Sequence, residues 1–156
     1  MGWSSTEILT ATGGKMVRAG SSSRFGDIVT DSAKVKKGSV FVALKGEKFD
    51  GHSFAADAVK RGAVCLIVHR SARLPSRSSA AVIKVTDTLR ALGDLAHFRR
   101  EQFNPRVLAI TGSNGKTTTK EMVAAILEEA SLDGEALRGK VLKTEGNFNN
   151  LVGLPL

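Results

Sequence analysis

The residues best suited to chemistry form a glycine-rich loop, Gly112-Ser-Asn-Gly-Lys-Thr-Thr118. Glycines in such a loop let successive backbone N–H groups converge on phosphate oxygens. Lys116 would reach the β and γ phosphates of a nucleotide, and the hydroxyl of Thr117 would bind Mg²⁺. The residues predicted to form this phosphate site are Gly112, Ser113, Asn114, Gly115, Lys116, Thr117 and Thr118.

The loop is shorter than the common phosphate-binding pattern, G-x-x-x-x-G-K-[ST]. Ile110 stands where that pattern has its first glycine, so a purely structural glycine turn is the alternative interpretation. The flanking residues favour phosphate binding, because residues 107–111 predict an apolar strand before the loop and residues 117–130 predict a helix after it. Strand, glycine loop and helix in this order are typical of a parallel α/β nucleotide-binding domain.

The elements that precede the loop predict a separate α/β domain. Asn104 and Pro105 disfavour helix and mark the boundary, so we expect one domain at 1–104 and the beginning of a nucleotide-binding domain at 105–156. The elements expected in the first domain are a helix capped by Ser4 and Glu7 and ended by Gly13, strands at 39–44, 64–68 and 81–85, and helices at 53–61 and from 87 or 88 to 102. Beyond the loop helix we expect a loop at 133–139, a short strand at 140–143 and a polar turn at 145–150.

Composition excludes several classes of protein. With 42% hydrophobic and 24% charged residues, the chain of 156 residues is predicted to be soluble and globular. Its longest apolar run, residues 63–68, is too short to cross a bilayer. Cys65 is the one cysteine and is expected to be an inert core residue, and the first residues lack a secretory pattern. We therefore expect a cytoplasmic protein with no membrane partner.

The net charge of +8 comes entirely from the first two thirds of the chain. Residues 1–105 contain 17 basic and 9 acidic side chains, whereas residues 106–156 contain 6 of each. Arg70, Arg73 and Arg77 lie in one basic stretch, but no aromatic residue is interleaved with them and the chain has no Tyr. Base stacking is therefore unsupported and no nucleic-acid partner is expected, although a basic nucleic-acid binder remains an alternative.

Several stretches together resemble the Mur ligases, which extend the UDP-linked muramic acid precursor of bacterial peptidoglycan. The loop at 111–118 is similar to the ATP loop of that family. Residues 30–32, 38–46 and 49–52 resemble its UDP-binding N-terminal domain. The segment Glu145-Gly-Asn-Phe-Asn-Asn-Leu-Val-Gly-Leu-Pro155 resembles one typical of the family member that adds D-alanyl-D-alanine.

The resemblance implies an ATP-dependent C–N ligase that works through an acyl phosphate. ATP would phosphorylate the terminal carboxylate of UDP-MurNAc-tripeptide, and the amine of D-alanyl-D-alanine would then displace phosphate. It implies Lys116 as the catalytic residue and Thr117 as the Mg²⁺ ligand. It also implies that Asn147, Asn149 and Asn150 lie near the ATP, although these asparagines fit a tight-turn cap equally well.

The resemblance also implies a substrate site in the first domain. The residues expected to contact the uridine and the diphosphate are Ser32, Lys45, Gly46, Phe49, Asp50, Gly51 and His52. His52 fits a turn or helix cap equally well, and His69 and His97 are expected on the surface. Ala33 stands where the family has an arginine, which removes a possible charge contact unless Lys34 replaces it.

The chain matches only part of the family pattern. Residues 106–156 supply too few elements to enclose a nucleotide, and the glutamate, histidine and modified lysine that the family uses around its metal ions have no counterpart in this sequence. We therefore expect the 156-residue chain to be a monomer that is inactive by itself. The alternative is a non-catalytic UDP-sugar-binding module from a truncated or split gene.

Overall fold

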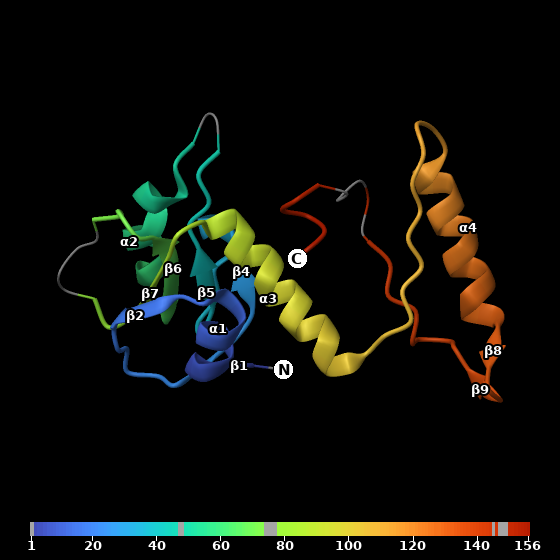
Figure 1. Ribbon diagram of the computed structural model, residues 1–156, viewed down its shortest axis with the longest axis horizontal. Coiled ribbons are helices and arrows are strands. Elements are labelled where there is room, and N and C mark those ends of the chain that lie inside the picture. The colour runs from blue at the N-terminus through green and yellow to red at the C-terminus, as the bar shows by residue number, and fades with distance from the viewer. Residues whose placement is uncertain (1, 47–48, 74–77, 145, 147–149) are drawn as a thin grey trace. The chain divides into compact units, whose positions relative to one another are not determined.

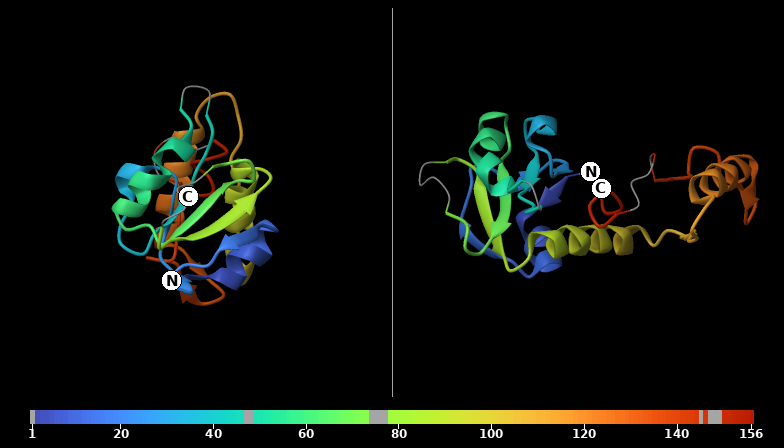
Figure 2. Two further views of the ribbon diagram at one scale, coloured as in Figure 1. Left: turned by 90° about the vertical axis from the view of Figure 1, so that its left-hand side faces the viewer. Right: turned by 90° about the horizontal axis from the view of Figure 1, so that it is seen from above.

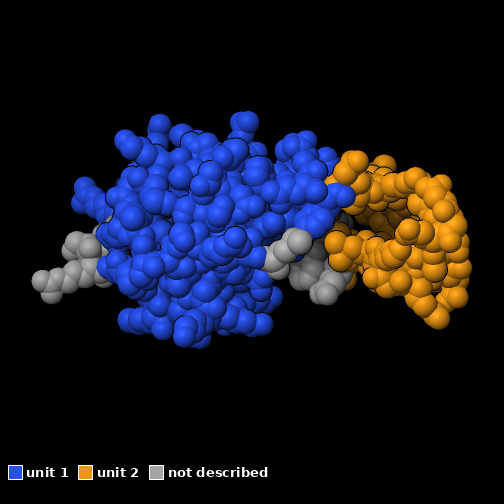
Figure 3. Space-filling model, turned by 90° about the horizontal axis from the view of Figure 1, so that it is seen from below, with its two compact units in different colours: residues 1–103, 155–156 blue, residues 104–154 orange. Residues whose placement is uncertain are grey.

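A computed structural model describes residues 2–46, 49–73, 78–144, 146 and 150–156. They separate into unit 1, which holds residues 1–103 and 155–156, and unit 2, which holds residues 104–154 (Figure 3). The division falls where the long helix α3 (Thr88–Phe103) ends. Asn104 has a left-handed backbone with φ of 43° and precedes Pro105, so neither residue continues the helix.

Unit 1 is built on a five-stranded sheet whose order is β2-β7-β6-β5-β4 (Figure 1). The strands are β2 (Lys15–Arg18), β4 (Ile28–Val29), β5 (Val40–Val42), β6 (Cys65–His69) and β7 (Ala81–Val85). Strands β4 to β7 run parallel, and β2 pairs antiparallel with β7. A separate antiparallel pair joins β1 (Trp3–Ser4) to β3 (Arg24–Phe25). The expected α/β class is confirmed, and the parallel strands described here belong to unit 1.

Helices cover both faces of this sheet (Figure 2). On one face, Phe41 and Leu66 pack with Ala58 of α2 (Ala55–Lys60) in a single apolar cluster. Successive side chains of a strand point to opposite faces, so Ile67 faces the side that α3 covers together with α1 (Ser5–Thr12). Because β5 and β6 are buried on both faces, apolar residues follow one another along these strands and do not alternate with polar ones.

Local signals placed most elements of unit 1 correctly. The capping box is present, because Ser4 Oγ accepts from Glu7 N at 3.2 Å and Glu7 Oε2 accepts from Ser4 N at 2.7 Å. The helix expected at 53–61 consists of a 3₁₀ turn, η2 (Gly51–Phe54), followed by α2. Cys65 is fully buried, and this burial raises the pKa of its thiol to about 12, which agrees with an inert core role.

Strands β1 to β4 were not predicted, because none of them carries a run of apolar residues. β2 lies at the edge of the sheet and β4 has two residues, so pairing with a neighbour and not composition makes them strands.

Unit 2 consists of α4 (Lys116–Glu129) and a hairpin of β8 (Ser131–Leu132) and β9 (Glu135–Ala136). Two predictions are wrong here, since residues 107–111 and 140–143 form no strand. Val107 and Leu108 are 63% and 65% exposed, and a strand requires a partner for its backbone. The loop expected at 133–139 is wrong in part, because its Asp133-Gly134 pair has positive φ at both residues and closes the hairpin.

Among the described residues, no helix has the length and the apolar character needed to cross a membrane.

Candidate functional site

The glycine-rich loop leads directly into the N-terminus of α4. Gly115 is the N-cap and has a left-handed backbone with φ of 75°, a conformation that favours glycine. The N-cap makes no side-chain hydrogen bond within the described part of the chain, and the first helical bond runs from Thr119 N to Gly115 O at 2.9 Å. The first turn of a helix has N–H groups without helical partners, so this end of α4 can donate to an anion.

The side chain of Lys116 folds back over the loop. Its Nζ donates to the carbonyl oxygen of Gly112 at 2.5 Å and lies 3.5 Å from that of Ser113. The ammonium therefore lies against the carbonyl groups of the loop. Phosphate oxygens can replace these carbonyls as acceptors, because a lysine ammonium has three donors and forms stronger bonds with charged acceptors.

The other residues of the loop are open to solvent. Ser113, Asn114, Thr117 and Thr118 are all exposed. A threonine hydroxyl is an oxygen ligand of the kind that Mg²⁺ takes, so Thr117 fits the expected metal role as one ligand. Among the described residues, no three His, Cys, Asp or Glu side chains gather as a metal site.

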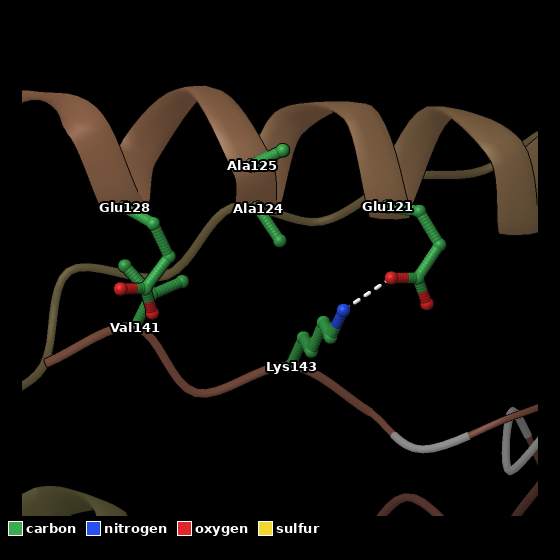
Figure 4. Close-up of a pocket in the computed structure, with 6 residues that line it drawn as sticks. All are labelled: Glu121, Ala124, Ala125, Glu128, Val141 and Lys143. Atoms are coloured by element: carbon green, nitrogen blue, oxygen red, sulfur yellow. Dashed lines mark hydrogen bonds and ion pairs between the residues drawn. The ribbon is translucent and has the colours of Figure 1, made fainter. Parts of the chain in front are cut away.

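A network of charged residues on α4 was missed in the sequence. Lys120, one turn after Lys116, donates from Nζ to Thr144 O at 2.5 Å and to Gly146 O at 3.1 Å. It also pairs with Glu121 at 3.1 Å, and Lys143 pairs with the other oxygen of that carboxylate (Figure 4). The bond from Lys143 is the main cause that holds the pKa of Glu121 below its usual value, and Lys120 adds to it. The spacing of four residues between Lys116 and Lys120 was the available signal.

This network holds residues 143, 144 and 146 beside α4. Figure 4 shows the two sides of the resulting pocket, with Glu121, Ala124, Ala125 and Glu128 on the helix and Val141 and Lys143 on the facing segment. The same segment leads toward the asparagines expected near ATP.

Of the three asparagines expected near ATP, the structure describes Asn150. Asn147 and Asn149 lie outside the described residues. Asn150 Oδ1 accepts from Val152 N at 3.1 Å and from Gly153 N at 2.7 Å, so this side chain caps a turn. Asn150 thus has the arrangement that the sequence offered as the alternative, a cap of a tight turn.

In unit 1, the expected substrate residues lie beyond the carboxyl ends of neighbouring parallel strands. Ser32 begins a 3₁₀ turn, η1 (Ser32–Lys34), after β4, and Asp31 caps it by accepting from Ala33 N at 2.8 Å. After β5, residues 44–46 lie antiparallel to residues 49–51, with a bridge between Lys45 and Asp50, and these six residues are called the hairpin 44–51. Because β4 and β5 are adjacent and parallel, both segments follow the carboxyl ends of strands at the same end of the sheet, where open α/β sheets bind ligands.

The hairpin 44–51 is held mainly by its own backbone. Gly46 N donates to Phe49 O at 2.9 Å and Gly51 N donates to Leu44 O at 2.7 Å. A Cβ on Gly51 would lie 2.6 Å from Leu44 O, so only glycine fits there. Phe49 is 72% exposed and presents its ring to solvent beside Lys45 and Gly46.

The root of the hairpin is joined to β6 through His52. Its Nδ1 lies 2.5 Å from Asp50 Oδ1, and its Nε2 accepts from the backbone N–H of His69 at 2.9 Å. Hydrogen bonds from His52, first from its backbone and then from its side chain, lower the pKa of Asp50. Both ring nitrogens of His52 are therefore used within the protein.

The two remaining histidines differ from each other. His69 was expected on the surface but is half-buried at the end of β6, with Nδ1 2.7 Å from Ser71 Oγ. The side chain of His97 is 58% exposed and pairs with Glu101, as expected for a surface residue.

Comparison with known families gives two matches along the chain. Residues 25–100 match the Mur ligase family, catalytic domain, and residues 110–156 match the Mur ligase middle domain.

Curated relatives are similar over most of this chain. The UDP-N-acetylmuramoyl-tripeptide–D-alanyl-D-alanine ligases of Haemophilus influenzae and Bacillus subtilis are 50% and 44% identical over 129 residues, which is 83% of this chain. The chain covers only 27% and 26% of their respective lengths.

Solved structures give the same result for the fold. A crystal structure of MurF from Acinetobacter baumannii aligns with a TM-score of 0.81 at 37% identity, over 99% of this chain and 32% of that one. MurF from Thermotoga maritima in complex with ADP aligns with a TM-score of 0.65 at 35% identity, over 82% of this chain and 27% of that one.

Proposed function

Because the chain belongs to the Mur ligase family, we propose that it supplies the first part of an ATP-dependent ligase that joins D-alanyl-D-alanine to UDP-MurNAc-tripeptide. The reaction forms a C–N bond in peptidoglycan precursor synthesis and takes place in the cytoplasm. The chain spans about a quarter to a third of the length of the relatives that it matches. Residues 1–104 form the UDP-substrate domain and residues 105–156 begin the ATP-binding domain.

The observation that carries this proposal is the position of Lys116 at the open N-terminus of α4. Its ammonium already lies over the loop, 2.5 Å from Gly112 O. There it would stabilise the negative charge spread over the γ-phosphoryl group during transfer. The backbone N–H groups of residues 112–118 would orient the phosphates. Thr117 would contribute a hydroxyl ligand to Mg²⁺, which supplies further neutralisation of phosphate charge when bound.

The proposed reaction has two steps. A carboxylate oxygen of the tripeptide attacks the γ-phosphorus of ATP, which forms an acyl phosphate and releases ADP. The amine of D-alanyl-D-alanine then attacks the acyl carbon, which forms the amide and releases inorganic phosphate and a proton. Unit 1 would hold the UDP end of the substrate, with Ser32, Lys45, Gly46 and Phe49 as contacts and with Asp50, Gly51 and His52 shaping the hairpin.

A titration and a turnover assay on the 156-residue chain test the assignment of its two parts. Calorimetry should detect binding of UDP-MurNAc-tripeptide. Lys45→Ala should weaken this binding, whereas Lys116→Ala should leave its affinity unchanged, because Lys116 belongs to the ATP loop. Phosphate release with all three substrates should stay at background. Robust turnover would contradict the expected inactivity, and loss of UDP binding in Lys116→Ala would contradict the division of roles.

One observation favours a second candidate, a UDP-sugar-binding module without catalysis. Apart from Ala124, every apolar residue that is buried in the described part of the chain lies in unit 1. A chimera distinguishes the two candidates, with this chain replacing the matching segment of the Haemophilus influenzae ligase. A ligase origin predicts turnover that Lys116→Ala lowers by about 10²- to 10³-fold, whereas a binding module predicts a chimera that binds UDP-MurNAc-tripeptide without turnover.

A further inference from the structure

Among the described residues of the hairpin 44–51, no side chain is fully buried. Lys45, Gly46 and Phe49 are all exposed, and the backbone bonds within the hairpin fix its shape but not its direction. A ligand site on such a hairpin needs a contact that fixes it against the sheet, since an ångström of misplacement weakens binding and catalysis.

His52 makes that contact. Its side chain is 16% exposed and lies where the hairpin passes into η2. Nε2 accepts from the backbone N–H of His69, a residue 17 positions later at the carboxyl end of β6. Because a backbone N–H can only donate, Nε2 must carry a lone pair, and a neutral ring then holds its proton on Nδ1. That proton points at Asp50 Oδ1, which lies 2.5 Å away.

Asp50 completes the arrangement from the hairpin side. The same Oδ1 accepts from His52 N at 3.0 Å, so one carboxylate oxygen caps η2 and orients the ring. Among the described residues, Asp50 faces the ring from the hairpin side and His69 from β6, and Lys45 acts electrostatically on Asp50. The ring of His69 is directed to Ser71 and leaves only its backbone N–H for His52.

We infer that His52 is a positioning residue, a neutral imidazole with its proton on Nδ1 that joins the hairpin 44–51 to the end of β6 and thereby fixes Lys45 and Phe49 for the UDP end of the substrate. This inference rests on the proposed function. It assigns His52 no direct contact with the substrate, because both of its ring nitrogens are engaged.

The first test is spectroscopic and uses the wild-type chain. Long-range ¹H–¹⁵N correlation of the imidazole at neutral pH should show the Nδ1–H tautomer for His52, and saturation with UDP-MurNAc-tripeptide should leave that tautomer unchanged. A charged ring, the Nε2–H tautomer, or a switch of tautomer on binding would overturn the inference.

The second test compares two substitutions that each keep one half of the contact. In His52→Gln, the longer side chain can still accept from His69 N, whereas in His52→Asn the shorter one can reach only Asp50. Calorimetry with UDP-MurNAc-tripeptide should give about tenfold weaker binding for His52→Asn and a change within about threefold for His52→Gln. Exchange of the His69 amide hydrogen should accelerate only in His52→Asn.

The control is His97→Gln, which alters an exposed histidine of α3 and should bind as the wild type does. Equal affinity in all four proteins would overturn the positioning role and leave the proposed function intact. If the wild-type chain bound no UDP-MurNAc-tripeptide while His52 showed the Nδ1–H tautomer, the proposed function would fail, whereas the contact between the hairpin and β6 would stand.

Discussion

Unit 1 and unit 2 differ most in how far the side chains of their apolar residues are buried. In unit 1, Phe41, Ile67 and Ile83 of the central strands are at most 1% exposed. In unit 2, Met122 and Ile126 of α4 are 61% and 66% exposed. Burial of apolar area provides most of the free energy of folding, at about 25 cal/mol per Å². That stabilisation is therefore concentrated in unit 1.

The two units also differ in how their helices begin. The N-terminus of α1 is closed by Ser4 and Glu7, whose side chains satisfy the first backbone groups. The N-terminus of α4 begins at Gly115, which has no side chain to offer. A closed helix end favours stability and an open one favours anion binding. The packed core and the helix end that is open to an anion thus lie in separate units.

Amide hydrogen exchange should show the largest difference between the units. We expect the amide of Ile67 in β6 to exchange at least about 10³-fold more slowly than that of Ala124 in α4, because only the strand requires disruption of a packed core to open. Mass spectrometry or NMR of the whole chain would measure this. Equal protection of the two amides would remove the contrast between the units.

Two isoleucine substitutions, one in each unit, should differ in how much they lower the free energy of unfolding. Ile67→Ala leaves a cavity on the face of the sheet that α3 covers and should lower the free energy of unfolding by about 2–5 kcal/mol. Ile126→Ala removes an exposed side chain and should change it by less than about 0.5 kcal/mol. Urea titration followed by circular dichroism reports on the helices of both units, and Trp3 fluorescence reports on unit 1, because this single tryptophan is 6% exposed beneath Arg99. Similar losses in both variants would indicate that α4 packs as tightly as the sheet.

Two glycines sharpen the comparison within unit 1. Gly51→Ala places a methyl group 2.6 Å from Leu44 O and should cost about 1–3 kcal/mol, together with part of the affinity for UDP-MurNAc-tripeptide. Gly46→Ala meets nothing closer than Phe49 O at 3.6 Å and should cost less than about 0.5 kcal/mol. Thermal unfolding and calorimetry would measure both. An unaffected Gly51→Ala protein would mean that the hairpin root tolerates a displaced Leu44.

The capping box should give the smallest effect. Ser4→Ala removes the acceptor for Glu7 N and should lower the free energy of unfolding by about 1 kcal/mol, with Ser5→Ala as the neutral control. The bond from Ser4 N lowers the pKa of Glu7, so the contribution of this carboxylate is present above the usual pKa of glutamate and is lost as the pH falls through the lowered value. Urea titrations at neutral and acid pH would measure both effects.

Much of unit 1 could be read from local signals. Ser4 with Glu7 gave the first helix, and the apolar run at 81–85 coincides with β7. The strand expected at 64–68 is displaced by one residue. β2 could not be found in this way, because its residues alternate between exposed and half-buried and only pairing with β7 makes them a strand. In unit 2, apolar residues alone predicted strands that have no partner.

The candidate site shows the same division. The types and spacing of Gly112, Gly115 and Lys116 were enough to predict a phosphate loop, because its chemistry depends on adjacent backbone groups. The sequence left two roles open for His52, a ligand contact and a turn residue. Its bond to the backbone of His69 became visible only when residues 17 positions apart were placed side by side.

The order of residues thus determined the loop, the helix caps and the family to which the chain belongs, since each depends on neighbours along the chain. Tertiary structure alone decided the edge strands, the joining of the hairpin to β6 and the contact of Lys120 with residues 144 and 146. The physical reason is that these features require partners brought together from distant positions. Local composition does not record which backbone groups will meet.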